Sequence, residues 1–432
     1  MRSKPPYHFN QALAARWPCA EMAFNTNRSP AKPEAEFALT LPPSDLPICV
    51  DGRMLRDRGT GVSTYARSLI DALEAASARP HLLSASHEDD SRLVRWLAAV
   101  AGQPQMVHRA QGGEREGREL VGRDIFRRAH VHFGLHQRPL TLRSAPPYGI
   151  MHWTYPVPLV MDGWVNLYTV HDAIPLIRPD LTPISAHRHR KVLDALLAHA
   201  HRLITVSDAA RDEIVAALGC DPDLVVNCGQ PADIGPRSVA ISQRFPHKGY
   251  LLYCGSIEPR KNLTALLAAY RASGSAMPLV IAGPEGWRAE SILRDIDATP
   301  GAVRLSYLAR DELLGLLEHA RALVFPSLAE GFGLPVIEAM ALGAAVLTSS
   351  VGALAEVAGG AALLVDPADH RALAAGTARI VADDELVGRL AALGHERARA
   401  FSQDAFIGRL SAVYGSAFDG RAFRDNQPVS VS

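Results

Sequence analysis

Two glutamates with a glycine-rich segment between them are the side chains of this sequence that best suit a defined chemistry. Glu330 and Glu338 are separated by seven residues, and Gly331 and Gly333 follow the first of them. Glycines allow a ligand to approach the backbone closely, and the free N–H groups at a helix start favour an anion such as a diphosphate. Carboxylates beside an anion site are better suited to accept hydrogen bonds from sugar hydroxyls. The segment therefore indicates a nucleotide-sugar site.

The elements around this segment place it at a strand-to-helix junction. Residues 322–325 are an apolar run typical of a short buried strand, and the glycine-containing loop follows it. Pro335 suits the first turn of a helix, because its fixed φ is helical and its missing N–H would be unbonded there. Gly343 is suited to end that helix. We therefore expect Glu330 on the loop and Glu338 a turn into the helix.

A basic doublet, Arg260 and Lys261, follows a second apolar run at residues 250–254. It lies where a loop turns into a helix. Two adjacent cations suit a pair of phosphates there, because arginine offers a planar fork of donors and lysine a point charge. The competing interpretation is a solvated pair of surface cations.

A histidine and an aspartate, His171 and Asp172, follow a clear strand pattern at residues 165–170. Ligands bind at the carboxyl ends of strands in a parallel α/β sheet. A lone histidine is more often a structural residue, so its position alone leaves both interpretations open. Asp172 either orients His171 or bonds the backbone of the following turn.

The first half of the chain opens with a strand, a glycine-containing loop and a helical pattern, at residues 48–51, 52–61 and 62–75. This succession has the form of a phosphate-facing turn, although such a loop is a weak signal by itself. Further along, residues 130–134 are typical of a strand end.

These segments resemble motifs of the retaining glycosyltransferases of family 4, which have the GT-B architecture. Glu330 to Glu338 is similar to the E-x7-E signature of that family. The stretch "TVHDAIPL" around His171 resembles its His-Asp element, and "GSIEPRKNL" around Arg260 resembles a further motif. The likeness covers residues 48–414 and is strongest in the second half.

The resemblance implies a role for each matched residue. It implies that His171 contacts the donor sugar at the reaction centre, that Glu330 accepts from a sugar hydroxyl, and that Glu338 holds the ribose hydroxyls. It also implies that Arg260 and Lys261 bind the donor diphosphate. Gly61 and Val62 would lie near the diphosphate and the acceptor. The N–H groups of Phe332, Gly333 and Leu334 would line the sugar and phosphate. Many family members carry arginine where this chain has Ser256, which places more of the charge on Arg260 and Lys261.

We expect an α/β fold of the GT-B type, with two Rossmann-like, doubly wound domains facing a central cleft and a C-terminal helix crossing back. Alternating strands and helices favour parallel, doubly wound sheets. The expected divisions are a loose extension at residues 1–46, an acceptor-side domain at 47–235, a linker at 236–249, a nucleotide-sugar-binding domain at 250–400, the returning helix at 401–418 and a tail at 419–432.

The composition, with 48% hydrophobic and 21% charged residues, is ordinary for a soluble globular protein. A net charge of zero gives no electrostatic case for nucleic acid. The five scattered cysteines indicate a reducing compartment, and no apolar run reaches the roughly 18 residues of a membrane helix. We expect a cytoplasmic protein, with peripheral contact to the inner membrane face if the acceptor is lipid-linked. The apolar residues 153–160 either serve that contact or pack as core.

The resulting functional prediction is a retaining hexosyltransferase that moves mannose from GDP-mannose onto a saccharide or lipid-linked saccharide in polysaccharide biosynthesis. The nucleotide-sugar is a co-substrate, and neither a resident cofactor nor a metal is expected. The alternatives are a UDP-glucose-type donor, a GT-B sugar phosphorylase or epimerase, and a non-catalytic sugar-nucleotide-binding protein. A nicotinamide oxidoreductase is disfavoured, because no G-x-G-x-x-G motif follows the first strand.

Overall fold

The structure is a computed structural model, and it describes residues 46–55, 61–86, 100, 102–110, 118–232 and 234–418. All of them belong to one compact unit, Leu39–Ser432. The expected tail at residues 419–432 lies outside the described residues, as does all of the expected extension except Leu46.

In this described part the first sheet has eight strands, in the order β11-β10-β9-β7-β1-β2-β5-β4. Neighbouring strands are parallel except β4 and β5. The bounds are β1 (Ile48–Asp51), β2 (His81–Ser86), β4 (His108–Arg109), β5 (Glu119–Arg123), β7 (Ile150–Trp153), β9 (Val165–Thr169), β10 (Arg202–Thr205) and β11 (Val225–Asn227). A small sheet of order β3-β6-β8 joins β3 (Gln105–Met106), β6 (Leu140–Arg143) and β8 (Leu159–Met161).

The second sheet is parallel throughout, in the order β14-β13-β12-β15-β16-β17. Its strands are β12 (Leu251–Cys254), β13 (Leu279–Ala282), β14 (Ala302–Leu305), β15 (Ala322–Phe325), β16 (Ala345–Ser349) and β17 (Leu363–Val365). Every residue of β12, β13, β15 and β16 is buried, as expected for parallel strands covered on both faces. This double burial explains why these strands read as uninterrupted apolar runs.

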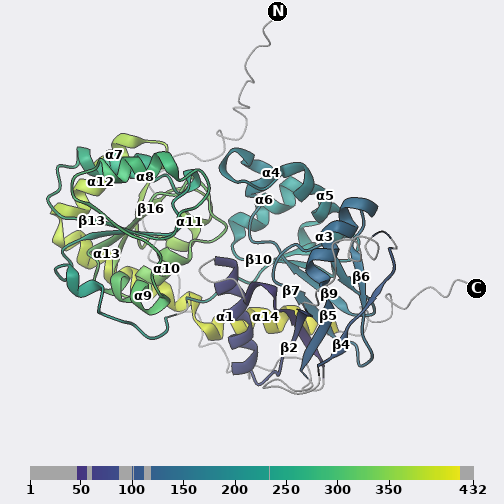
Figure 1. Cartoon of the computed structure of the whole chain (residues 1–432). Helices are drawn as coiled ribbons and strands as arrows, with labels where there is room; N and C mark the ends of the chain where they lie inside the picture. Colours follow the sequence, from purple (N-terminus) through teal and green to yellow (C-terminus); the bar gives the residue numbers. More distant parts are fainter. Residues whose placement is uncertain are drawn as a thin grey trace, which may run out of the picture. The chain divides into compact units, whose positions relative to one another are not determined.

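Helices connect the parallel strands in both sheets. The first set comprises α1 (Gly61–Ala75), α3 (Ile125–His136), α4 (Ile174–Ile177), α5 (Ala186–Leu197) and α6 (Asp208–Leu218). The second comprises α7 (Leu263–Ala272), α8 (Glu290–Asp297), α9 (Arg310–His319), α10 (Leu334–Ala341), α11 (Gly352–Ala358), α12 (His370–Ala382) and α13 (Asp384–Ala398). Figure 1 shows α7, α8 and α12 over one face of the second sheet and α9, α10 and α13 over the other.

In each sheet the order in which the chain adds strands reverses direction once. In the first sheet the chain steps outward from β1 to β2 and β5, then returns to β7 on the other side of β1. In the second it steps from β12 to β13 and β14, then returns to β15 beside β12. The crevice at the carboxyl ends of the strands at such a reversal is where doubly wound sheets bind ligands.

The C-terminal helix, α14 (Gln403–Phe418), packs against the first sheet. The Tyr414 hydroxyl lies 2.6 Å from His152 Nδ1, and the rings of Phe406 and Tyr65 meet edge to face at 6.1 Å. Arg409 Nε donates to the carbonyl oxygen of Cys228 at 2.6 Å. The chain thus returns from the second sheet to the first.

The structure decides two sequence-based expectations, one about residues 130–134 and one about residues 153–160. Residues 130–134 are helical, within α3, so the expected strand end there was wrong. The alternation of small and large residues around His130 resembles a strand, but the apolar positions Ile125, Phe126, Ala129 and Phe133 recur at helical spacing and are buried. Of the apolar set at residues 153–160, Trp153, Val157 and Leu159 are fully buried in the first core, so these side chains pack as core. No helix in the described residues is long and apolar enough to cross a membrane.

A buried hydrogen-bond chain fixes the protonation state of His152. Thr169 Oγ1 donates to the Tyr65 hydroxyl at 3.1 Å, so His152 Nε2 must donate to Thr169 Oγ1 at 2.8 Å. His152 Nδ1 then accepts from Tyr414. Burial, with a smaller effect of nearby His171, lowers the pKa of His152 to about 3. The imidazole is therefore neutral in the folded protein.

This neutral histidine predicts acid sensitivity. The unfolded chain binds a proton at His152 below about pH 6.5 and the folded chain does not, so stability is lost as pH falls. Between pH 6.5 and 5, the unfolding free energy of the parent should therefore fall by about 1.6 kcal/mol more than that of His152→Gln. Urea unfolding at both pH values measures this. Other groups with shifted pKa values, His130, His171, Asp51 and Glu213, also make stability depend on pH. They are present in both proteins, so their contributions cancel when the two pH profiles are subtracted. Parallel pH profiles would contradict the assignment.

Candidate active site

The basic doublet and the first glutamate form one ion-paired cluster. Arg260 Nη1 lies 2.7 Å from Glu330 Oε2, and Lys261 Nζ lies 2.6 Å from Glu330 Oε1. The second branch of the Arg260 fork, Nη2, binds Glu258 Oε1 at 2.7 Å. The Glu330 side chain is only 9% exposed and that of Lys261 10%. Two cations and two carboxylates thus meet in a nearly closed space.

The cluster lies where the second sheet reverses its winding direction. Arg260 and Lys261 form a short 3-10 turn after β12, and Glu330 follows β15, the adjacent strand. The backbone N–H of Leu328 donates to the Arg260 carbonyl at 2.9 Å, which ties the two loops together. Asn262, whose backbone is left-handed at φ 60°, donates through its side-chain amide to the carbonyls of Pro326 and Pro367. Asn262 went unnoticed in the sequence.

The charges of the cluster stabilise one another. Burial by itself raises the pKa of Glu330, but Arg260 and Lys261 outweigh it and hold the pKa at about 2. Burial opposes the charge on Arg260, yet Glu330 and Glu258 raise its pKa above the ordinary value. The pKa of Lys261 is lowered, because its burial outweighs the attraction of Glu330. Glu330 is therefore ionised and acts as an acceptor of hydrogen bonds.

The start of α10 presents backbone donors beside this cluster. Among the described residues, no acceptor is found for the N–H groups of Phe332, Gly333 and Leu334. Gly333 has φ 106°, a conformation that favours glycine, and a Cβ there would lie 2.5 Å from Leu354 Cδ2. The Phe332 ring is buried against Phe401. This geometry agrees with the sequence-based expectation of free donors at a helix start.

The second glutamate, Glu338, lies in α10 and pairs with a different arginine. Arg310 Nη2, at the start of α9, is 2.5 Å from Glu338 Oε1, and Glu338 is 2% exposed. Burial raises the pKa of the Cys254 thiol to about 12, and the charges of Glu338, Arg310 and Lys261 also act on it. Both ion-paired groups therefore lie around the carboxyl end of β12. Arg310 was missed, although its position opening a helix after a strand was a usable signal.

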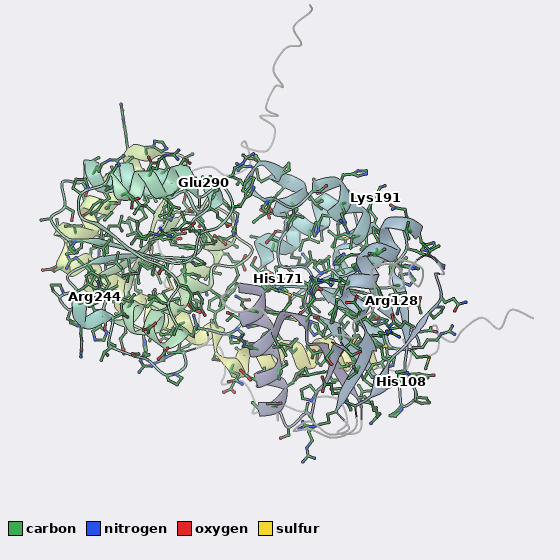
Figure 2. The ribbon with its side chains drawn as sticks, viewed as in Figure 1. His108, Arg128, His171, Lys191, Arg244 and Glu290 are labelled. Atoms are coloured by element: carbon green, nitrogen blue, oxygen red, sulfur yellow. The ribbon has the colours of Figure 1, made fainter. Side chains whose placement is uncertain are left out.

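From the first half of the chain, His171 follows β9 (Figure 2). Its Nε2 lies 2.9 Å from the Thr154 carbonyl oxygen, so Nε2 carries the hydrogen, and the Tyr65 ring packs edge-on at 4.9 Å. Burial lowers the pKa of His171 to about 4, which leaves a neutral ring with an unprotonated Nδ1. Asp172 accepts from the backbone N–H of Ile174 at 3.0 Å, the second of its two expected roles.

The two halves of the site meet at Gly331. A Cβ on Gly331 would lie 2.2 Å from the His171 carbonyl oxygen, so only glycine permits this approach. Ser207 Oγ donates to the Gly331 carbonyl at 2.7 Å. The charges of Arg260 and Glu330 both act on the Asp172 carboxyl, whose pKa burial raises. The structure thus brings His171 and Asp172 together with the cluster of Glu330, Arg260 and Lys261.

A second contact between the two halves uses a glutamate that the sequence did not single out. Both carboxylate oxygens of Glu356, on α11, accept from backbone N–H groups at the start of α6: Asp208 at 2.9 Å and Ala209 at 2.8 Å. A carboxylate at a helix N-terminus is favoured by the helix dipole. Glu356 thus stabilises the arrangement in which Gly331 meets His171.

Gly61 and Val62 stand apart from the other expected site residues. They open α1, and a Cβ on Gly61 would meet no atom within 4 Å. No hydrogen bond of theirs reaches the Arg260 cluster within the ranges that the structure describes. Residues 56–60 of the preceding loop lie outside those ranges. Their role at the diphosphate therefore stays a prediction.

Comparison with known proteins places the second half of the chain in a family. Residues 237–397 match the family model of glycosyl transferases group 1. The O-antigen chain mannosyltransferase B of Escherichia coli is 34% identical over 250 residues, 54% of this chain and 66% of the relative. The serotype-specific mannosyltransferase WbdA of Escherichia coli is 29% identical over 239 residues, 50% of this chain and 29% of the relative. The chain thus spans two thirds or less of the length of these relatives.

Solved structures support the same fold over nearly the whole chain. The sucrose-phosphate synthase of Thermosynechococcus elongatus superposes with a TM-score of 0.63 at 20% identity, covering 86% of this chain and 99% of that one. At this identity the likeness concerns the fold alone. The chain has the GT-B fold and is similar to mannosyltransferases, and its residues 237–397 match the family model of glycosyl transferases group 1.

Proposed function

We propose that this chain is a retaining glycosyltransferase that moves mannose from GDP-mannose onto a saccharide or lipid-linked saccharide in polysaccharide assembly. The observation that carries the proposal is the cluster of Arg260, Lys261 and Glu330 at the sheet reversal, with His171 against its loop. Such a cluster supplies positive charge for a diphosphate and an ionised acceptor for a sugar hydroxyl within one space. The similarity to mannosyltransferases supports mannose as the sugar.

In this proposal the bound donor replaces the ion pairs that Glu330 makes with Arg260 and Lys261 in the structure. The free N–H groups of Phe332, Gly333 and Leu334 and the two cations bind the diphosphate, and Glu330 turns to a hydroxyl of the sugar. Arg260 and Lys261 then stabilise the charge that grows on the leaving diphosphate in the transition state. Glu338, with Arg310 beside it, binds the ribose hydroxyls.

Retention of the anomeric configuration is proposed to follow a same-face course through an oxocarbenium-like state. The two carboxylates of this site are engaged: Asp172 by the Ile174 N–H, and Glu330 by two cations before the donor binds and, in this proposal, by a sugar hydroxyl afterwards. An ionised carboxylate with a pKa of about 2 is a weak nucleophile, which favours direct attack by the acceptor. In this proposal, neutral His171 contacts the sugar. NMR assignment of the product anomer tests this course, and an inverted product would contradict it.

The donor is tested by a thermal-shift screen of the full chain against GDP, UDP, ADP and their sugars. We expect the largest stabilisation from GDP and GDP-mannose, since a ligand that binds only the folded state raises its stability by mass action. Stabilisation by UDP and UDP-glucose alone would replace the proposed donor while keeping the reaction class. No shift with any nucleotide, together with no transfer, would contradict the proposed function.

Lys261→Gln should weaken binding of the free nucleoside diphosphate at least tenfold, since its charge is lost inside a space that excludes water. Tenfold corresponds to about 1.4 kcal/mol. Isothermal calorimetry measures it. Arg304→Gln is the matched control, because Arg304 belongs to the same sheet but pairs with the exposed Glu285 outside the cluster. Equal affinities for Lys261→Gln and the parent would remove Lys261 from the donor site.

Metal removal should leave transfer unchanged. Arg260 and Lys261, with the start of α10, are positioned to offset the charge of the diphosphate, which is the task a divalent cation performs in other transferases. Initial rates with and without EDTA measure this. Loss of activity that added Mg²⁺ or Mn²⁺ restores would mean that the charge balance of the site is incomplete without a metal.

A further inference from the structure

A second arginine site lies at the winding reversal of the first sheet. Arg53 follows β1, and its Nη1 binds the Tyr155 hydroxyl at 2.7 Å and lies 3.4 Å from His130 Nε2. The guanidinium carbon sits 5.4 Å from the centre of the Tyr155 ring and 5.9 Å from that of Phe126. Two rings and two hydrogen bonds therefore hold one half-buried cation in place.

This site adjoins the reaction centre. β1 and β7 are paired neighbours, so the residues that follow them meet at one sheet edge. The Thr154 carbonyl accepts from His171, its N–H donates to the Asp51 carboxylate, and the next residue supplies the hydroxyl that binds Arg53. His171 and Arg53 are thus held by adjacent residues, whose Cα atoms lie about 3.8 Å apart.

The site carries positive charge that no acid balances by direct pairing. Among the described residues, Arg53 makes no ion pair. The Asp51 carboxylate accepts from the Thr154 N–H, and burial raises its pKa while the charge of Arg53 partly opposes that rise. Because Arg53 donates to His130 Nε2, His130 keeps its hydrogen on Nδ1 as a further donor. The pKa of His130 is lowered to about 4 by burial and by the charges of Arg53 and Arg188.

The helices beside the site extend this charge. α3 contains two arginines and begins directly after Asp124, and the single acid of α5, Asp194, pairs with Arg190 at 2.7 Å. Arg188 and Lys191 of α5 are exposed and make no ion pair among the described residues. Figure 2 labels Lys191 on α5 and Arg128 on α3. In a chain with a net charge of zero, this local excess distinguishes the face.

We propose that Arg53, Arg188 and His130 bind a phosphate of the acceptor, so that the acceptor is a saccharide linked to a phosphate or diphosphate rather than a neutral saccharide. This inference rests on the proposed function. An arginine fork and a ring N–H match phosphate oxygens, and ring stacking orients Arg53 before the ligand arrives. Because successive residues hold Arg53 and His171, we place this phosphate on the acceptor side of the reaction centre.

Binding is tested with octyl diphosphate, titrated into the full chain by calorimetry while a nucleoside diphosphate saturates the donor site. We expect Arg53→Gln and Arg188→Gln each to weaken binding at least tenfold. Arg190→Gln, on the same helix but paired with Asp194, should stay within about twofold of the parent, because exposed pairs contribute little. Unchanged nucleoside diphosphate affinity confirms that the variants fold. Arg188→Gln should disturb folding less than Arg53→Gln, because the Arg188 side chain is exposed.

Transfer is tested with an octyl diphosphate-linked saccharide and the same octyl saccharide without phosphate. We expect both variants to raise KM for the phosphorylated acceptor at least tenfold and to leave kinetics with the neutral acceptor unchanged. Unchanged octyl diphosphate affinity in both variants would overturn the proposal. So would loss of binding only to phosphatidylglycerol vesicles, because the cations would then face a membrane surface. Neither result affects donor binding, so failure here is distinct from failure of the proposed function.

Discussion

Replacing Glu330 with glutamine is expected to reduce transfer at least about 100-fold, a loss of about 2.7 kcal/mol of transition-state stabilisation. Glutamine keeps the shape of the side chain but loses the charge that binds a sugar hydroxyl and pairs with Arg260 and Lys261. Nucleoside diphosphate affinity should stay equal or increase, because the two cations lose their competing partner. Initial rates and calorimetry on the same preparation separate the two effects.

Glu258→Gln is the matched control for this prediction. The Glu258 carboxylate pairs with the other branch of the Arg260 fork at 2.7 Å, and in the described structure it forms no ion pair with the Lys261 ammonium. We expect it to lower transfer less than tenfold. Glu330→Gln should also reduce the unfolding free energy by about 2–3 kcal/mol, since two poorly solvated cations lose one charge partner. Equal activity losses in the two variants would mean that Glu330 acts only as a counter-ion.

Gly331→Ala is expected to separate the two halves of the site. Its Cβ would lie 2.2 Å from the His171 carbonyl oxygen, closer than any real contact, so the loop or the histidine must move. A displacement of about 1 Å at a reaction centre costs roughly 100-fold in rate. Nucleoside diphosphate affinity should fall less than the rate, because the clash falls on His171 and Asp172 and not on Arg260 or Lys261.

The control for this variant is Gly388→Ala, where a Cβ meets nothing within 4 Å in the middle of α13. It should keep full activity and stability, since alanine favours a helix over glycine. Transfer by Gly331→Ala at the rate of the parent would show that the close approach to His171 does not matter for the reaction.

The residues that were visible in the sequence are those at the ends of buried parallel strands. The strands before Arg260 and Glu330 are apolar runs, and the strand before His171 is buried throughout, so the polar residues that follow them stand out. Topology then brings Arg260 and Glu330 to one edge of the second sheet, and His171 to the corresponding edge of the first. This made both the fold and the main cluster predictable.

The residues that were missed act through contacts between segments far apart in the chain. Glu356 caps α6 from α11, Arg310 reaches Glu338 across 28 positions, and Arg53 meets Tyr155 across 102. Each belongs to a residue type that is usually a solvated surface group, so nothing local marks it. Likewise, the sequence did not predict that Glu330 pairs with both Arg260 and Lys261, because the spacing of residues along the chain does not give the distances between their side chains.

The decisive experiment is an experimental structure of the chain bound to the nucleotide-sugar that the thermal-shift screen identifies. We expect diphosphate oxygens within hydrogen-bonding distance of Lys261 Nζ and the N–H groups at the start of α10. We also expect the Glu330 carboxylate on a hydroxyl of the sugar. A nucleotide-sugar bound elsewhere, with Glu330 still bridging Arg260 and Lys261, would contradict this expectation.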